Sequence, residues 1–330
     1  MSTLTNLLVS SSSSGRLRPF DMRRDLRPVA DLVERCFAET LDQEGERYLQ
    51  QMRSAANNPS FLRWAAAAAE GSSVPMSGYV WEEDGQVVGN ISLIPYTIHG
   101  QRLYLIANVA THPNYRRRGI ARKLTSHSIE HARRRGAPAA WLHVREENAA
   151  AVNLYLELGF EERARRTTWH SSSSIPQNTA LPGLVIGPRR AQHWGKQLAW
   201  LRSTYPPDVT WHLPLNLRAL RPGWQGTLYR FLAALPAWQY VLQRDGRLLG
   251  ALSWQPTRTY ADMLWLAAGP ENEAEAAHAL LLYARQQLSP RRRLSLDYPA
   301  GRAAEAIEAA GFQRHQTLIW MEVGLRGPEG

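Results

Sequence analysis

The chain has 330 residues, of which 44% are hydrophobic, and its formal net charge is +10. This length exceeds the usual size of one domain, so two domains with real cores are expected. No stretch approaches the roughly 18 consecutive apolar residues of a membrane helix, and the serine-rich start lacks the apolar centre of a secretion signal. We therefore expect a cytoplasmic protein with no membrane partner. The single cysteine, Cys36, excludes an internal disulfide and is expected to be an unreactive core thiol.

The first half of the chain shows an α/β pattern in chain order, after a start at residues 1–15 that we expect to be disordered. Residues 84–95 read DGQVVGNISLIP, in which Asp-Gly predicts a tight hairpin turn before a half-buried strand. A strand over 103–111 and an amphipathic helix over 120–135 follow. Residues 142–160 (LHVREENAAAVNLYLELGF) then predict a short strand, a second helix and a Gly-Phe turn.

A serine- and proline-rich connector is predicted over 171–182, between domains 16–170 and 183–330. Behind it a new strand starts at Leu184, and the pattern of the first half recurs in the same order. The recurring segments are 245–256 (DGRLLGALSWQP), 263–267, 273–288 and 294–312 (LSLDYPAGRAAEAIEAAGF). This internal repeat predicts two α/β domains, each with a mixed sheet.

The strongest chemical signal lies between the strand and the long helix of the first half, where residues 113–124 read PNYRRRGIARKL. A strand that turns into a helix aims free backbone N–H groups and the positive end of the helix dipole at one place, where a pyrophosphate can bind. Gly119 and Ala121 keep this place open, and nearby arginines can add charge-assisted hydrogen bonds. The alternative is an arginine-rich helix start on a solvated face.

Arg116, Gly119 and Ala121 match the signature of the GNAT superfamily of acetyl-CoA-dependent N-acetyltransferases, which the chain resembles. The resemblance implies two tandem GNAT-like domains, each a mixed, mostly antiparallel central sheet flanked by helices, in a layout similar to that of tandem proteins such as mycothiol synthase. It also implies that acetyl-CoA is the cosubstrate, without a metal. The implied coenzyme-binding residues are Val109, Ala110, Thr111, Arg116, Arg117, Arg118, Gly119, Ile120, Ala121, Arg122 and Asn148.

Tyr155 occupies the position that the resemblance assigns to the general acid, which would give a proton to the departing CoA thiolate. Ordinary helix packing is its alternative role. The resemblance implies direct attack by an amine, with no covalent enzyme intermediate, while the backbone N–H of Val109 polarises the acetyl carbonyl. The base stays open among Glu82, Glu83, His99, His112, Glu39 and Asp42.

The second half lacks these residues. Its counterparts of Arg116, Gly119, Ala121, Asn148 and Tyr155 are Glu273, Ala276, His278, Ala300 and Ile307. Acidic residues at this helix start would repel a pyrophosphate. We therefore interpret the second domain as a degenerate copy with a structural or acceptor-shaping role.

Two other functions fit the composition less well. One is a non-catalytic acyl-CoA sensor or interaction module. The other is a basic nucleic-acid-binding protein, but the sequence shows no zinc pattern, basic zipper or RNA-binding aromatic signature. For the enzyme, a small-molecule or peptide amine is the expected acceptor, and the chain is expected to be a monomer or a homodimer. Tryptophans crowd the second half, where they are expected in the core, at an interface or in an acceptor pocket. They are Trp194, Trp200, Trp211, Trp224, Trp238, Trp254 and Trp265.

Overall fold

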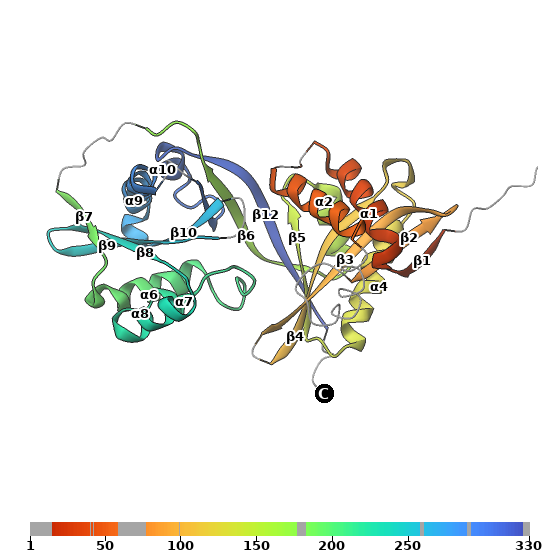
Figure 1. Cartoon of the computed structure of the whole chain (residues 1–330), viewed down its shortest axis with the longest axis horizontal. Helices are drawn as coiled ribbons and strands as arrows, with labels where there is room; N and C mark the ends of the chain where they lie inside the picture. The colour runs from red at the N-terminus through yellow and green to blue at the C-terminus, as the bar shows by residue number, and fades with distance from the viewer. Residues whose placement is uncertain are drawn as a thin grey trace, which may run out of the picture. The chain divides into compact units, whose positions relative to one another are not determined.

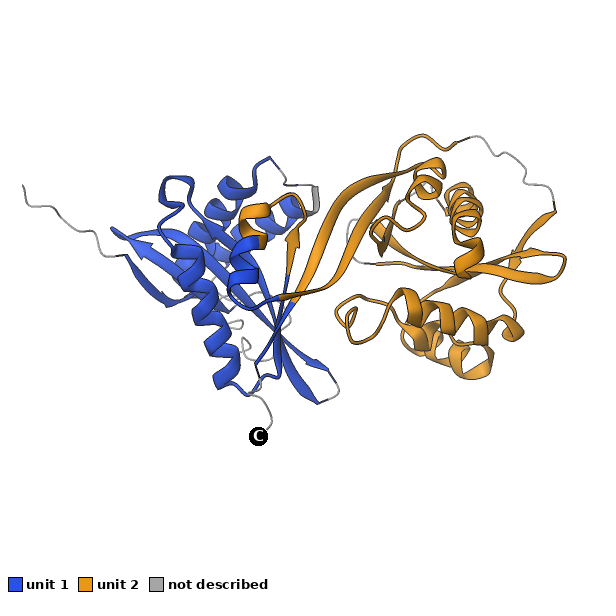
Figure 2. Cartoon of the chain, turned by 180° about the vertical axis from the view of Figure 1, so that it is seen from behind, with its two compact units in different colours: residues 1–142, 153–160, 322–330 blue, residues 143–152, 161–321 orange. Residues whose placement is uncertain are grey.

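The computed structural model describes the chain over residues 15–39, 41, 43–58, 77–98, 100–176, 183–257, 261–288 and 292–325. The chain forms two compact units, coloured separately in Figure 2. Unit 1 comprises residues 1–142, 153–160 and 322–330, and unit 2 comprises 143–152 and 161–321. Each unit is described by itself below.

Unit 1 is built on a sheet with the strand order β1-β2-β3-β4-β5. The strands are β1 (Arg16–Pro19), β2 (Gly78–Glu83), β3 (Gln86–Ile98), β4 (Gln101–Thr111) and β5 (Ala139–Arg145), and residues 143–145 of β5 belong to unit 2. The helices are α1 (Met22–Phe37), α2 (Gln43–Ala56), the 3-10 turn η1 (Pro113–Tyr115), α4 (Ile120–Arg134) and α5 (Ala149–Glu157). β4 and β5 run parallel, and the other neighbouring pairs run antiparallel.

Helices cover both faces of the unit 1 sheet (Figure 1). Val80 and Ala110 pack into the apolar cluster of α1 and α2. Gly89 faces the other way, since a Cβ placed there would lie 2.7 Å from Ile120 and 3.1 Å from Leu124 of α4. The absence of a side chain at Gly89 therefore lets α4 pack closely on β3.

Unit 2 holds a sheet with the order β12-β6-β11-β10-β9-β8-β7. Its strands are β6 (Glu161–Ser171), β7 (Leu184–Pro188), β8 (Trp238–Arg244), β9 (Arg247–Gln255), β10 (Ala261–Ala268), β11 (Arg293–Pro299) and β12 (Phe312–Gly324). Figure 1 shows α9 (Glu273–Leu288) and α10 (Ala304–Ala309) on one face of this sheet. The other face carries η2 (Ala191–His193), α6 (Trp194–Thr204), α7 (Leu217–Leu220) and α8 (Gly223–Leu232), and η3 (Pro270–Asn272) precedes α9.

The predicted internal repeat is confirmed by the topology. Asp84 and Gly85 join β2 to β3 with φ values of 50° and 75°, and Asp245 and Gly246 join β8 to β9 with 49° and 74°. Two successive positive φ angles define the type I′ hairpin turn that Asp-Gly favours. β10 and β11 are parallel like β4 and β5, so each unit has the expected mixed, mostly antiparallel sheet flanked by helices.

One strand pairs across the predicted division of the chain at the connector. β6 follows the first Gly-Phe turn, yet it pairs antiparallel with β11 in unit 2, for example Thr168 with Asp297. Side-chain periodicity predicts a strand but not its partner. Residues 177–182 of the expected connector, and 1–14 of the expected disordered start, lie outside the described residues, so these boundaries stay predictions.

Candidate functional site

The strand that leads to the arginine-rich turn is β4, and a bulge interrupts it. Asn90 pairs with Ala110 but Ser92 pairs with Ala107, so two residues of β4 stand opposite one residue of β3. Asn108, with a φ of 50°, is one of the two residues of this bulge. Bulges bend a strand and redirect its backbone groups, and they are common beside active sites.

Side chains hold the bulge in place. The amide Nδ2 of Asn108 donates to Tyr48 Oη at 3.1 Å and to Ser92 Oγ at 3.3 Å. Asn90 Nδ2 donates to the carbonyl oxygen of Asn108 at 2.9 Å. α2, β3 and β4 are thereby joined at one point.

β4 and β5 separate just before the bulge. Their parallel pairing runs from Tyr104 with Ala140 to Ile106 with Leu142. For residues 107–111 no partner on β5 is found in the described part of the chain, which leaves that edge of β4 open. A strand edge of this kind can hydrogen-bond an extended ligand. Val109, Ala110 and Thr111, for which the sequence predicts coenzyme binding, lie on this segment.

Residues 116–119 form the turn between η1 and α4. Arg117 has a φ of 61° and Gly119 a φ of 75°, and Gly119 is the N-cap of α4 without a side-chain cap. A Cβ at Gly119 would have no atom within 4 Å. The first turn of α4 contains no acidic residue. The first N–H groups of a helix have no intrahelical partner, so this end of α4 presents open donors and a positive dipole end.

The three arginines of the turn, and Arg122 in the first turns of α4, are placed differently from one another. Arg118 donates from Nη2 to Glu83 Oε1 at 2.9 Å, and Arg122 is paired with Glu157. Arg116 lies with Nε 3.4 Å from the carbonyl oxygen of Thr111, and Arg117 is exposed. Arg116 and Arg117 therefore remain the better placed of the four for an anion at the helix start, because the other two already contact carboxylates.

α5 carries the second set of predicted residues. Asn148 caps it, since its Oδ1 accepts a hydrogen bond from the N–H of Ala151 at 3.2 Å. Tyr155 is 6% exposed and packs edge-on against Phe160, with ring centroids 5.8 Å apart. Burial raises the pKa of the Tyr155 phenol to about 12. The phenol therefore keeps its proton at neutral pH and is available to donate a hydrogen bond.

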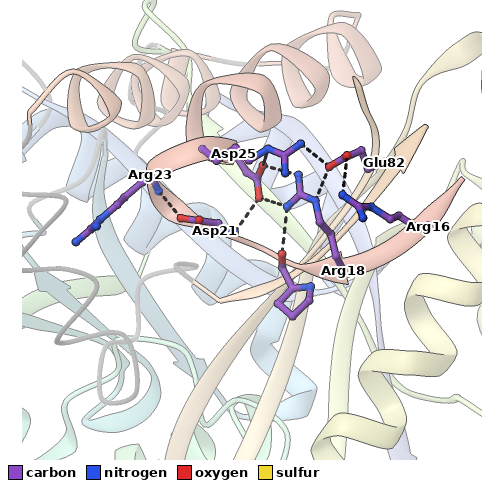
Figure 3. Close-up of polar contacts among 8 residues, drawn as sticks. Arg16, Arg18, Asp21, Arg23, Asp25 and Glu82 are labelled. Carbon is purple, nitrogen blue, oxygen red and sulfur yellow. Dashed lines mark hydrogen bonds and ion pairs between the residues drawn. The ribbon is translucent and has the colours of Figure 1, made fainter. Parts of the chain in front are cut away.

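Two acidic candidates for the base, Glu82 and Glu83, are occupied by arginines. Figure 3 shows Glu82 beside Arg16 and Arg18. Hydrogen bonding to Arg18, followed by that to Arg24, lowers the pKa of Glu82 to about 2, so this carboxylate is a poor proton acceptor. Glu83 is held by Arg118.

The remaining candidates that the structure describes are not placed for catalysis either. His112 lies at the head of the turn, where its Nε2 is 2.7 Å from Nη1 of Arg35, and burial with the neighbouring arginines lowers its pKa. Glu39 is exposed at the end of α1. His99 and Asp42 lie outside the described residues. The geometry thus assigns the base to none of the described candidates.

The structure adds one residue that sequence patterns did not connect to the site. Cys36 of α1 is partly buried and donates from Sγ to the carbonyl oxygen of Thr111 at 3.3 Å. Burial raises the pKa of this thiol, which keeps it protonated. A lone cysteine carries no sequence signal for such a contact. Cys36 is predicted to be an unreactive core thiol, and the structure adds that it supports the end of β4 through this hydrogen bond.

A cavity of about 320 Å³ lies in unit 1 between α1 and the β2–β3 turn. Asp25, Leu32, Val88 and His112 are among its lining residues. None of the predicted coenzyme-binding residues lines it, nor does Tyr155. The cavity therefore adjoins the end of β4 through His112 without including the predicted coenzyme-binding residues. Among the described residues no group of three or more potential metal ligands is found.

Comparison with known proteins gives a consistent result. Residues 28–160 match the acetyltransferase (GNAT) family. The [ribosomal protein bS18]-alanine N-acetyltransferase of Escherichia coli (strain K12) is 37% identical over 79 residues, which are 24% of this chain and 53% of that protein. Mycothiol acetyltransferase of Thermomonospora curvata is 29% identical over 149 residues, 45% of this chain and 44% of that protein. The chain thus spans about half the length of the curated relatives it matches.

Among solved structures, the GCN5-related N-acetyltransferase of Sphaerobacter thermophilus superposes with a TM-score of 0.57 at 13% sequence identity. The superposition covers 95% of this chain and 96% of that chain, so the fold is shared over both units. The motif at the start of α4 lies inside the matched residues, and the same topology recurs in unit 2. Residues 28–160 therefore form a domain that matches the acetyltransferase (GNAT) family, and a tandem copy of the topology follows it.

Proposed function

We propose that the chain is an N-acyltransferase that moves an acetyl or short acyl group from CoA to a primary amine. The observation that carries this proposal is the open start of α4, directly after a β4 edge without a β5 partner. The first feature suits a pyrophosphate, and the second suits the extended pantetheine arm. Bound acetyl-CoA would supply the activated thioester.

The residues at this place fit the coenzyme. The N–H groups from Arg117 to Arg122 are offered to the pyrophosphate, and Gly119 leaves room for its oxygens. The backbone of Val109, Ala110 and Thr111 is offered to the pantetheine arm. The Asn108 bulge, fixed by its hydrogen bonds, holds the Val109 N–H ready to polarise the acetyl carbonyl.

Tyr155 is proposed as the donor to the departing sulfur. A phenol with a pKa of about 12 is a weaker acid than a thiol, whose ordinary pKa is about 8.5. Its contribution is thus a hydrogen bond that stabilises negative charge on sulfur while the bond to carbon breaks, and the thiolate takes its final proton from this group or from water.

Unit 2 supports a coenzyme site in unit 1 by contrast. α9 begins at Glu273, directly after η3, with no intervening turn. Ala276, the counterpart of Gly119, is fully buried inside the helix, and Ile307, the counterpart of Tyr155, is fully buried in the core. Glu273 accepts a hydrogen bond from Tyr298 Oη at 2.6 Å. The acidic helix start repels a pyrophosphate, and the buried Ala276 leaves no space for one at the position of Gly119.

The acceptor is proposed to be a small-molecule amine or a peptide N-terminus. The names of two relatives point to an acceptor of each kind. The [ribosomal protein bS18]-alanine N-acetyltransferase is named for a protein alanine, and mycothiol acetyltransferase is named for a small molecule. An amine-library screen that follows CoA release tests the proposal, together with titration calorimetry of CoA. We expect turnover with at least one amine and one CoA bound per chain.

The second candidate is a non-catalytic acyl-CoA sensor, which the buried Tyr155 and the absence of an assigned base among the described candidates favour. Binding of CoA at one site per chain, without CoA release on any amine, would support the sensor. A stoichiometry of two, or binding that survives a change at Gly119, would instead overturn the placement of the coenzyme in unit 1 alone.

A further inference from the structure

α8 in unit 2 presents its large apolar side chains to solvent. The exposed fractions are 73% for Trp224, 46% for Leu228, 81% for Phe231 and 73% for Leu232. Their spacing of four, seven and eight residues after Trp224 places them on one face of the helix. An exposed apolar face of this kind marks an interaction site.

The orientation of α8 is fixed by its polar side, which faces inward. Arg230 Nη1 donates to the carbonyl oxygen of Ala219 at 2.9 Å, and Tyr229 Oη accepts a hydrogen bond from Asn216 Nδ2 at 3.0 Å. Gly226 is buried, and a Cβ there would lie 1.9 Å from a carbonyl oxygen of the preceding turn. The helix thus has the reverse of the usual amphipathic arrangement, and rotation about its axis would break these contacts.

The apolar face lies within a strongly basic part of the chain. Residues 183–244, which include α6, α7 and α8, contain eight Arg and Lys side chains and one acidic residue, Asp208. Arg218 and Arg221, next to the start of α8, are exposed. Figure 1 shows these three helices together on one face of the unit 2 sheet. Apolar side chains and positive charge are therefore offered on the same side of the unit.

We propose that α8 and its flanking arginines are a docking surface for an anionic lipid membrane. Helices that lie in a membrane interface combine Trp, Phe and Leu on one face with Arg and Lys around it, and anionic headgroups attract the basic residues. The sequence predicts no membrane partner because it predicts no span, and none of the described helices combines the length and apolarity of a span. Docking on the surface requires neither.

Charge favours a lipid surface over a second copy of the chain. A symmetric contact through α8 would bring two basic segments together, with only Asp208 in each to offset the repulsion. Nucleic acid would satisfy the charge and could stack on Trp224 and Phe231, but the aliphatic Leu228 and Leu232 offer a base no such platform. A lipid surface satisfies both the charge and the apolar side chains.

Sedimentation of the full chain with vesicles tests the proposal. The vesicles contain phosphatidylcholine alone, or phosphatidylcholine and phosphatidylglycerol in equal parts. We expect binding only with phosphatidylglycerol, weakened by added salt. Phe231→Ser combined with Leu232→Ser should lower the bound fraction about tenfold or more, because both side chains insert into the interface.

Two further variants keep the test independent of folding. Ile175→Ser changes an exposed apolar side chain elsewhere in unit 2 and should bind like the wild type. Arg221→Gln should fold normally and bind phosphatidylglycerol vesicles severalfold more weakly. Failure of the wild type to bind, or equal binding by the Phe231 and Leu232 double variant, overturns the proposal. The proposal is also overturned if the wild type dimerises or is retained on RNA instead of binding lipid, and the double variant abolishes that dimer or that retention.

Discussion

The imidazole rings of His143 and His212 lie against each other in unit 2, with centroids 4.5 Å apart. His143, on β5, also stacks on Trp320 at 4.7 Å. Burial is the main reason that the pKa of His143 falls well below its ordinary value, with His212 as the second cause. Burial, and then Arg166, lowers the pKa of His212 to about 4. Both rings are therefore neutral in the folded protein at neutral pH.

This pair predicts that unit 2 loses stability in acid. Because the folded pKa values lie below the unfolded value of about 6.5, the unfolded chain binds more protons between these limits. The stability is complete above about pH 6.5 and falls as the pH is lowered toward 4, by up to about 3 kcal/mol from His212 alone. Urea unfolding followed at several pH values checks this, and His212→Phe should flatten the dependence. If His212→Phe keeps the pH dependence of the wild type, the loss of stability in acid comes from other groups.

Tyr155→Phe should lower kcat about a hundredfold or more while KM for acetyl-CoA changes little. The phenyl ring retains the contact with Phe160 and removes only the donor. Steady-state kinetics of CoA release provide the measurement. Tyr205→Phe, a change at a buried tyrosine of unit 2, should leave kcat unaltered. Equal kcat values for wild type and Tyr155→Phe would assign the donor role to another group.

Gly119→Glu should weaken CoA binding about a hundredfold or more, because it adds a negative charge beside the pyrophosphate at the helix start. Gly136→Glu is the matched control at the other end of α4. Its φ of 72° and its open surroundings resemble those of Gly119, so the backbone strain is similar. Calorimetric Kd values that rise together in both variants would point to a general loss of folding rather than of the site.

Asp25→Ala should destabilise the protein by about 3 kcal/mol or more. Asp25 is fully buried and accepts hydrogen bonds from Arg18 Nη2 at 2.8 Å and from the N–H of Asp21 at 2.8 Å, as Figure 3 shows. Its removal takes a buried charged acceptor from the Arg18 guanidinium and from the N–H of Asp21, and Arg18 keeps its contact with Glu82. Asp31→Ala on the same helix removes an exposed pair with Arg53 and should cost less than about 1 kcal/mol. Urea unfolding compares the two, and equal losses would contradict the argument.

Local signals predicted much of the fold. The two Asp-Gly turns form the expected hairpins, and α9 has the predicted bounds, Glu273–Leu288. The N-cap role of Asn148 is likewise found. These features depend on neighbours in the chain, which is why a pattern of a few residues suffices.

Non-local features escaped prediction. The pairing of β6 with β11 and the Asn108 bulge depend on partners distant in sequence. The contact of Cys36 with Thr111 spans 75 residues. Trp224, expected in a core or a pocket, is largely exposed, because the polar side of α8 is the one that finds hydrogen-bond partners.

The uninterrupted start of α9 limits how easily the second half could regain the anion-binding turn of the first half. The difference between the halves at this position is one of backbone conformation, since the residues that turn before α4 are coiled into the first turn of α9. Exchanging Ala276 for Gly would loosen a buried helical turn without unwinding it. To regain an anion-binding end, a stretch of chain would have to leave the helix and Glu273 would have to release Tyr298. A single substitution therefore cannot restore coenzyme binding to α9.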